Sequence, residues 1–276
     1  MFVNKIASVF DFYIKSSIHI SLCVLAFVII TCLRFEIKLD FLILFVVFNA
    51  TIVVYNFIKY ASTLPYYFIV KNVSTKKIQY LSFFSGFLLF TSLFFVSLKT
   101  LVLGFFIFIF CIIYVIPFNH SRGNFRNHSK IKIFIVAFCW ASATVFLPII
   151  NENKINYLNS FLLFFQRFVF VIAYTIPFEI RDLKYDSLQL ETIPQLLGII
   201  KTKKAATVLL IVFLIISLVL EPVGFKFLIS DSIIVIITAY FVWTSKIRQK
   251  KYFASFWVES IPLIWLAILI VMKLFS

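Results

Sequence analysis

The sequence has 276 residues, of which 63% are hydrophobic and 13% are charged, and its mean hydropathy is +1.07. This apolar share is far above that of soluble globular domains and leaves no stretch from which a separate soluble domain could be built. The formal net charge of +15 does not indicate a nucleic-acid partner, because the basic residues stand in short loops between apolar runs. Anionic membrane lipids are the expected partners of such loops.

The apolar runs predict an all-α polytopic membrane protein, because a helix needs about 20 mostly apolar residues to cross a bilayer. A single integral-membrane domain over residues 1–276 accounts for the chain, and the first run is too long for the core of a cleaved signal peptide. Nine transmembrane helices are expected, at residues 16–33, 40–58, 79–97, 100–117, 131–150, 158–178, 206–222, 226–243 and 254–275.

The basic residues are divided unevenly between the two sides of these nine helices. Positively charged loops mark the cytoplasmic side, so we expect the N-terminus in the cytoplasm and the C-terminus outside, in an inner or cell membrane. The outer side holds Arg34, Lys38, Lys99, Lys154, Lys226 and Lys273. The cytoplasmic side holds nineteen of the 26 basic residues: Lys5, Lys15, Lys59, Lys71, Lys76, Lys77, Arg122, Arg126, Lys130, Lys132, Arg181, Lys184, Lys201, Lys203, Lys204, Lys246, Arg248, Lys250 and Lys251.

Isolated polar residues inside the spans have two interpretations each. Arg167 is either a functional intramembrane charge or a side chain that reaches the outer interface. Asp231 and Glu259 are each either a proton or cation ligand, or a helix cap or paired group. The four cysteines lie in apolar spans without paired spacing and are expected to be small core residues: Cys23, Cys32, Cys111 and Cys139.

Residues 174–198 concentrate negative charge in a chain that otherwise avoids it. They hold four of the eleven acidic residues, whereas residues 41–151 hold none. Glu179, Asp182 and Asp186 are spaced i, i+3, i+7, which places all three on one face of a helix. Oxygen ligands on one face suit Mg²⁺ shared with substrate phosphates. The alternative is a solvated face in which mixed charges neutralise one another.

The same stretch carries a recognisable motif. It reads Asp182-Leu-Lys-Tyr-Asp186, followed by Thr192-Ile-Pro and Gly198, and long cytoplasmic loops follow the second and sixth spans. These features resemble the UbiA superfamily of intramembrane prenyltransferases, over the whole chain in topology and over residues 174–198 in motif. The nine helices would then form a 4+4+1 bundle with two sets of equal orientation. Where that family has a first acidic motif, N-D-x-x-D-x-x-x-D, this chain has Asn56-Phe-Ile-Lys-Tyr, without a carboxylate.

The resemblance implies a prenyltransferase that moves an isoprenoid chain from a prenyl diphosphate to a lipophilic or aromatic acceptor, such as a quinone precursor. It implies Mg²⁺ as cofactor, with Glu179, Asp182 and Asp186 as metal ligands and Asp182 and Asp186 as catalytic residues. Basic side chains in the loop that lacks carboxylates could bind the diphosphate as point charges. The residues expected to contact the diphosphate are Asn56, Lys59, Arg181, Lys184 and Lys201.

Two other functions compete with this one. A catalytically degenerate relative that binds a prenyl or lipid diphosphate, or assists a membrane pathway as a partner, fits the missing first motif. A secondary transporter fits less well, because transporters place ionisable residues near the bilayer midplane, whereas here the acidic cluster stands at a helix end. Neither the acceptor nor the length of the prenyl chain has a signature in the sequence.

Overall fold

A computed structural model describes residues 2–60, 73–115, 117–119, 123–124, 129–152, 156–186, 191–220 and 224–274. Outside these ranges lie residues 187–190 of the acidic stretch and four basic residues assigned to a membrane side above: Lys71, Arg122, Arg126 and Lys154. The elements in chain order are α1 (Phe2–Lys15), α2 (Ile18–Arg34), α3 (Phe41–Tyr60), α4 (Val73–Leu93), α5 (Leu98–Val115), β1 (Pro117–Asn119), β2 (Gly123–Asn124), α6 (Ser129–Ala141), η4 (Ser142–Phe146), α7 (Leu147–Ile149), α8 (Tyr157–Asp182), α9 (Ile193–Leu197), α10 (Ile199–Val219), α11 (Phe225–Thr244), η6 (Phe253–Val258) and α12 (Ile261–Leu274).

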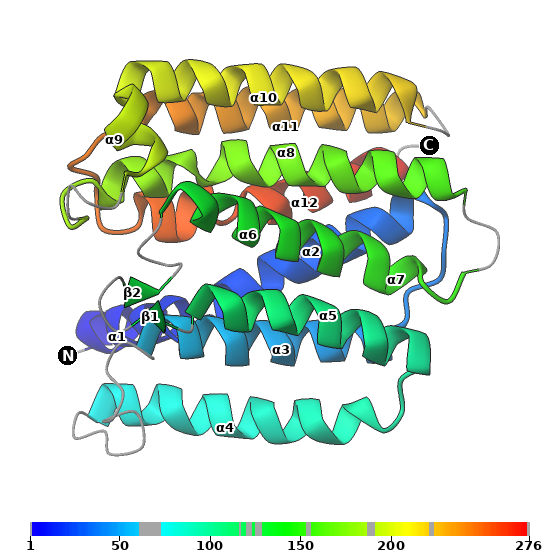
Figure 1. Ribbon diagram of the computed structural model, residues 1–276, viewed down its shortest axis with the longest axis horizontal. Helices are drawn as coiled ribbons and strands as arrows, with labels where there is room; N and C mark the ends of the chain where they lie inside the picture. The colour runs from blue at the N-terminus through cyan, green and yellow to red at the C-terminus, as the bar shows by residue number, and fades with distance from the viewer. Residues whose placement is uncertain are drawn as a thin grey trace.

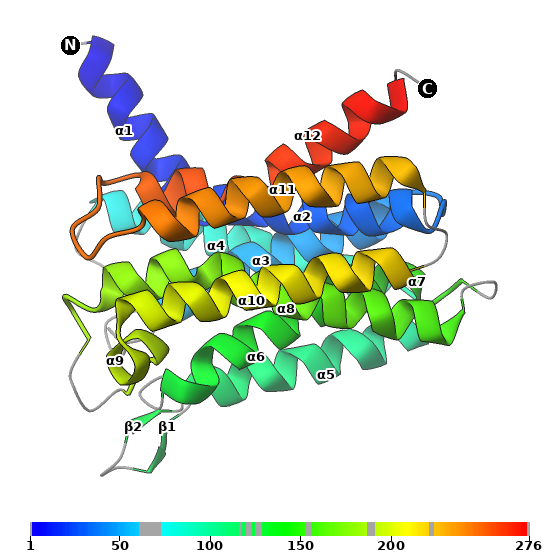
Figure 2. The same ribbon diagram turned by 90° about the horizontal axis from the view of Figure 1, so that it is seen from above.

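The long helices run side by side, and α1 projects from the bundle at an angle (Figures 1 and 2). The short antiparallel pair β1–β2, α9 and the C-terminal end of α8 lie at one end, which we call the Asp182 end. The C-terminal ends of α2 and α12 lie at the other, which we call the Arg34 end. Helix α8 packs against both α6 and α10, and α2 packs against both α3 and α12.

Aromatic rings hold the centre of the bundle together. Phe27, Phe170, Phe213 and Trp265 come from α2, α8, α10 and α12, and all four are fully buried. The Phe170 ring centroid lies 5.0 Å from that of Phe213, 5.2 Å from that of Trp265 and 6.1 Å from that of Phe27. Aromatic pairs at such distances add to the van der Waals packing on which helix association in lipid depends.

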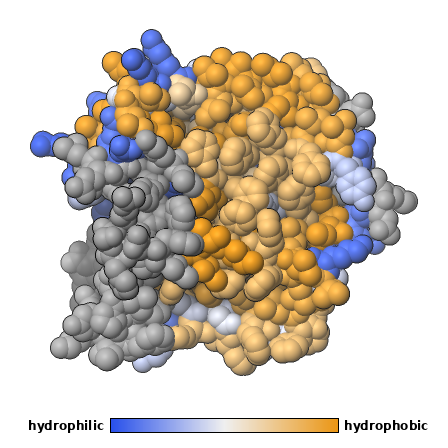
Figure 3. Space-filling model, viewed as in Figure 1, coloured by the Kyte–Doolittle hydropathy of each residue, from blue (hydrophilic) through white to orange (hydrophobic). Residues whose placement is uncertain are grey.

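Apolar side chains also cover the outside. Figure 3 shows a broad hydrophobic surface over the middle of the molecule, with hydrophilic residues toward its two ends. Phe87 and Phe90 on α4 and Phe105 on α5 are among the exposed apolar side chains of the protein. An apolar patch of this extent marks a surface that contacts lipid rather than water.

Each of the nine predicted spans overlaps a helix, but nine membrane crossings are not confirmed. Among the described residues, six helices are long and apolar enough to cross a membrane, and the pair α1–α2, bent by 57°, would make a seventh. Helix α5 is too short, since its apolar part covers only Leu98–Tyr114. Helix α4 is long enough to cross a membrane but not apolar enough, because its first turns are polar, with the sequence VSTKKIQY. The chain is therefore an all-helical membrane protein, apart from β1–β2, with six or seven candidate spans.

The bend between α1 and α2 is fixed by a buried polar junction. Ser17, with a left-handed φ of 65°, separates the two helices. Its Oγ donates to Asn56 Oδ1 at 2.8 Å, and Asn56 Nδ2 donates to Ser16 O at 3.1 Å and to Ser82 Oγ at 2.9 Å. The Asn56 amide on α3 thus connects the α1–α2 junction to α4 by hydrogen bonds, and these bonds fix the arrangement of the helices at the Asp182 end.

Residues 192–198 make the turn into α10. Thr192 and Gln195 form a reciprocal capping box at the start of α9, and Gly198 at φ 77° and ψ 157° joins α9 to α10. This backbone conformation is essentially restricted to glycine. The motif residues Thr192 and Gly198 therefore have a structural role in placing α10 beside α8.

Gly198→Ala is expected to lower the free energy of unfolding by about 1–3 kcal/mol, because a Cβ forces strain on this backbone. A Cβ would meet no atom within 4 Å, so the effect isolates backbone conformation. The measurement is the thermal unfolding of the purified protein in detergent. Gly104→Ala is the matched control, because Gly104 lies inside α5 with equally open space. A loss at Gly104 as large as at Gly198 would contradict the prediction.

Candidate functional site

Charged side chains from four elements gather at the Asp182 end. Lys59 comes from the last turn of α3 and Lys132 from the first turn of α6. The end of α8 supplies Glu179, Arg181 and Asp182, and Glu259 follows η6 directly. We call these six residues the charged cluster.

Two ion pairs organise the end of α8. Lys132 Nζ lies 3.6 Å from Glu179 Oε1, and the Glu179 side chain is 8% exposed. Arg181 Nε donates to Asp182 Oδ1 at 2.7 Å while Arg181 Nη2 donates to Asp182 Oδ2 at 3.1 Å. The second pair is bidentate, which fixes the orientation of the guanidinium. Both pairs remain partly open to solvent on the cation side.

The predicted three-carboxylate face is not formed by the helix. Helix α8 ends at Asp182, and Asp186 lies beyond it in a turn closed by a 2.9 Å bond from Asp186 N to Asp182 O. Helix α8 therefore carries two of the three predicted carboxylates, Glu179 and Asp182, while Asp186 follows it. Asp186 still acts electrostatically on Lys132 and Glu179, so it stays near the cluster.

The carboxylates at this end do not fit a magnesium ion as they are arranged. Glu179 is paired with Lys132 and Asp182 with Arg181, so each carboxylate already has a cationic partner. Over the part of the chain that the structure describes, no three His, Cys, Asp or Glu side chains are grouped closely enough to hold a metal. We therefore assign no chemical step to a metal ion.

Lys59 and Glu259 interact electrostatically within the cluster. Lys59 is exposed, and its Nζ donates to Ser17 Oγ at 2.9 Å. Glu259 is 9% exposed and interacts electrostatically with both Lys59 and Arg181. The Glu259 carboxylate makes no hydrogen bond or ion pair with the residues that the structure describes. It is thus a buried carboxyl group close to two cations that it does not contact directly.

The other residues predicted to bind diphosphate lie differently. Asn56 is fully buried, and its amide is occupied by the α1–α2 junction. Lys184 is exposed, with Nζ 4.4 Å from the Tyr185 ring centroid, and Lys201 is exposed on the first turn of α10. Lys59 and Arg181 belong to the charged cluster, and diphosphate binding by all five residues stays a prediction.

Lys132 is the member of the cluster that the sequence does not reveal as a site residue. It is separated from Glu179 by 47 positions and looks like one more basic residue at the start of an apolar run. Glu259 is visible as an intramembrane carboxylate, but its neighbours Lys59 and Arg181 come from distant segments. No local spacing rule connects these residues.

An aromatic wall adjoins the cluster. Trp140 Nε1 donates to Tyr55 Oη at 2.6 Å, and the Trp140 ring centroid lies 5.9 Å from that of Tyr174. Tyr55 and Trp140 also line an apolar pocket of about 80 Å³ between α3, α5 and α6, together with Val54, Ile58, Cys111, Tyr114, Ile135, Val136 and Cys139. The pocket is smaller than the ~300 Å³ of a typical small-molecule site.

The cysteines are free, as expected. Cys23 and Cys32 are buried in α2, which confirms them as small core residues. Cys111 and Cys139 are partly buried at the pocket, with their Sγ atoms 3.8 Å apart.

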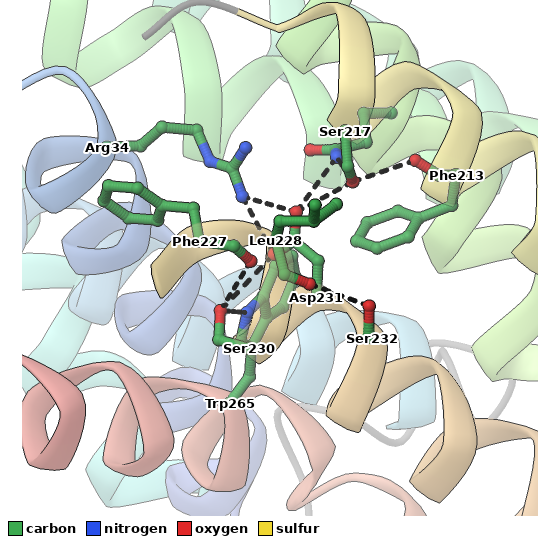
Figure 4. A network of polar contacts seen from close by, with 10 residues as sticks. Arg34, Phe213, Ser217, Phe227, Leu228, Ser230, Asp231, Ser232 and Trp265 are labelled. Atoms are coloured by element: carbon green, nitrogen blue, oxygen red, sulfur yellow. Dashed lines mark hydrogen bonds and ion pairs between the residues drawn. The ribbon is translucent and has the colours of Figure 1, made fainter. Parts of the chain in front are cut away.

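A second polar cluster lies inside the bundle toward the Arg34 end (Figure 4). Arg34 Nη2 donates to both oxygens of Asp231, at 2.8 and 2.7 Å, and both side chains are buried. Ser217 Oγ donates to Asp231 Oδ2 at 2.8 Å and accepts from Gln166 Nε2 at 2.6 Å. Asp231 is thus a paired group, one of the two interpretations left open by the sequence.

Arg167 is also buried, with 0% exposure. Its side chain does not reach the outer membrane interface, so this one of the two interpretations of Arg167 is excluded. Its Nη1 donates to Phe27 O at 3.1 Å, and its guanidinium lies 4.2 Å from the Phe27 ring centroid and 5.3 Å from that of Trp265.

Comparison with known proteins supports the fold. No protein-family model matches the sequence, and no curated protein matches it. A solved structure from work on a digeranylgeranylglyceryl phosphate synthase in membranes matches 96% of this chain and 98% of its own, with a TM-score of 0.58 and 18% identity. The predicted resemblance is confirmed at the level of the fold, which is all that a similarity of this identity shows.

Proposed function

We propose that this chain is an intramembrane prenyltransferase of the UbiA type, which transfers an isoprenoid chain from a prenyl diphosphate to a lipophilic or aromatic acceptor. The observation that carries the proposal is the charged cluster, because it places Lys59, Lys132 and Arg181 around one helix end beside an apolar, aromatic-lined pocket. The fold shared with a membrane synthase supports it. In this proposal the nine helices form a 4+4+1 bundle with the cluster on the cytoplasmic face.

Transfer breaks the allylic C–O bond of the donor and leaves a diphosphate that carries the electron pair. Cations fixed at the position where this charge develops stabilise the transition state. Arg181 is held in place by Asp182, and Lys132 by Glu179. The allylic cation is stabilised by the aromatic faces of Tyr55, Trp140 and Tyr174.

The new bond forms between the allylic carbon and a nucleophilic atom of the acceptor, which then loses a proton. Glu259 is the proton acceptor in this proposal, because it is a buried carboxylate without a hydrogen-bond partner beside Lys59 and Arg181. General bases of this kind need to lie within hydrogen-bond reach of the proton that they remove. Of the predicted catalytic residues, Asp182 acts here by positioning Arg181, and Asp186 acts electrostatically on Lys132.

Magnesium enters the proposal only through the family resemblance. Because the described carboxylates face cations, we expect prenyl diphosphate to bind in the presence of EDTA through Lys59, Lys132 and Arg181. Calorimetric titration of the purified protein, with EDTA and then with added Mg²⁺, measures this directly.

Asp182→Asn is expected to lower transfer about 100-fold or more, since Arg181 loses the carboxylate that orients it. The assay follows labelled farnesyl and geranylgeranyl diphosphates in membranes that contain the protein, and records prenylated product and released diphosphate. Lys99→Met is the control, because Lys99 is an exposed cation near the Arg34 end. Unchanged release of diphosphate by Asp182→Asn would contradict the proposal.

A catalytically degenerate relative is the second candidate function. One specific observation favours it: the Asn56 amide, the remnant of the first acidic motif, is fully used inside the protein. Such a protein would bind prenyl diphosphate and release none, with any acceptor supplied. Binding without release in the same assay distinguishes it from the transferase.

A further inference from the structure

Arg167 has one edge of its guanidinium group without a partner. Its Nη1 donates to Phe27 O, but neither Nε nor Nη2 has an acceptor within hydrogen-bond distance among the residues that the structure describes, although both atoms are buried. Nε and Nη2 point the same way and form the edge with which arginine binds anions through two parallel hydrogen bonds. The flanking rings of Phe27 and Trp265 contact the faces of the group and leave this edge unsatisfied.

The charge around Arg167 is not balanced by the cluster shown in Figure 4. Arg34 and Arg167 are both buried, and Asp231 is the one carboxylate among the described residues that acts on Arg167. Asp231 is already occupied, because its oxygens accept from Arg34 and Ser217. The three charges sum to +1, and over the described ranges of the chain Arg34 Nε also has no acceptor.

An unpaired charge in a buried site is costly unless a counter-charge and hydrogen bonds compensate it. Cation–π contact stabilises the group only in part, because a ring face carries no full negative charge and accepts no strong hydrogen bond. A helix that keeps such an arginine inside a membrane bundle therefore needs an additional anionic or strongly accepting group at the free edge.

We propose that the free edge of Arg167 binds a small monovalent anion of chloride size, as the counter-ion of this cluster. A small ion is favoured over a phosphate-bearing ligand for two reasons. The rings of Phe27 and Trp265 flank the Arg167 guanidinium, and Arg34, which lies toward the end of the bundle, is only 2% exposed. The site is independent of the proposed function, since Arg167 stands 15 positions before Asp182 on α8.

The test compares thermal unfolding of the full chain in detergent with sodium chloride, bromide or gluconate at constant ionic strength. Chloride and bromide are expected to raise the unfolding midpoint saturably, by roughly 5 °C at about 100 times Kd, and gluconate is not. Arg167→Lys, which keeps the charge but loses the fork, is expected to lose most of this shift. Arg248→Lys, an exposed loop arginine, is the matched control and should keep it.

Bromide also provides a measurement that needs no variant. In crystals of the unmodified protein grown with sodium bromide, an anomalous peak is expected beside Nε and Nη2 of Arg167. Equal unfolding midpoints in all three salts, or density at this position that gives no bromide signal, would overturn the proposal and assign an ordered water to the edge. A variant that fails to fold does not affect this outcome.

Discussion

Asp231→Asn is expected to lower the free energy of unfolding by about 3–5 kcal/mol, because it leaves the Arg34 guanidinium buried without its anion. The two side chains are 2% and 0% exposed, and the bond lengths between them are 2.7 and 2.8 Å. Asp231 also accepts from Ser217 on α10. The change therefore weakens the contacts among α2, α10 and α11 together, and chemical or thermal unfolding in detergent measures the loss.

The control for this prediction is the exposed pair at the opposite end. Lys251 Nζ lies 2.7 Å from Asp11 Oδ1, with side-chain exposures of 61% and 27%. The hydrogen bond to Asp11 raises the pKa of Lys251 above its usual value, yet exposed pairs contribute at most about 1 kcal/mol. Asp11→Asn should therefore have little effect. A double variant, Arg34→Met with Asp231→Leu, should be more stable than Asp231→Asn, and equal stability of all these variants would refute the interpretation.

Glu259→Gln is expected to lower prenyl transfer by about 10²–10⁴-fold, the usual contribution of a positioned general base. The amide keeps the size of the side chain and removes its ability to take a proton. Binding of prenyl diphosphate should be unchanged or tighter, since an anion beside Lys59 and Arg181 is lost. Turnover and binding are measured separately, so a lower rate with retained affinity is the expected result.

Glu152→Gln provides the comparison, because Glu152 is an exposed carboxylate that follows α7 near the Arg34 end. It should leave both turnover and binding as they are. Loss of binding in Glu259→Gln would mean that Glu259 holds the site in shape rather than accepting a proton.

The helices of this protein could be predicted because a bilayer demands long apolar segments. All nine expected spans overlap a helix, and 131–150 and 254–275 correspond to continuous helical segments even though each contains a π-helical stretch. Composition does not reveal whether a helix crosses fully. Helix α4 begins with Lys76 and Lys77 in its first turns, and α5 is short, so both fall below the requirement for a span.

The site could be predicted only where its residues are neighbours in sequence. Arg181 and Asp182 are adjacent, and the structure joins them. The sequence does not predict that α8 ends at Asp182, because the carboxylates have the same spacing in sequence whether or not the helix continues. Lys132 could not be found at all, since its contact with Glu179 arises from the packing of α6 on α8.

The π-helix η6 gives the placement of Glu259 an unusual dependence on chain length. In η6, Trp257 N bonds to Tyr252 O and Glu259 N bonds to Ala254 O, five residues back rather than four. Such a stretch is equivalent to one extra residue in an α-helix, and each residue of an α-helix turns the chain by about 100°. Deleting one residue between 253 and 258 would change the rotation between the two ends of η6. Either Glu259 or the residues before η6 that contact α1 would then lose their present orientation. A change in the number of residues within η6 would therefore remove the Glu259 carboxylate from the site, although no functional residue had been substituted.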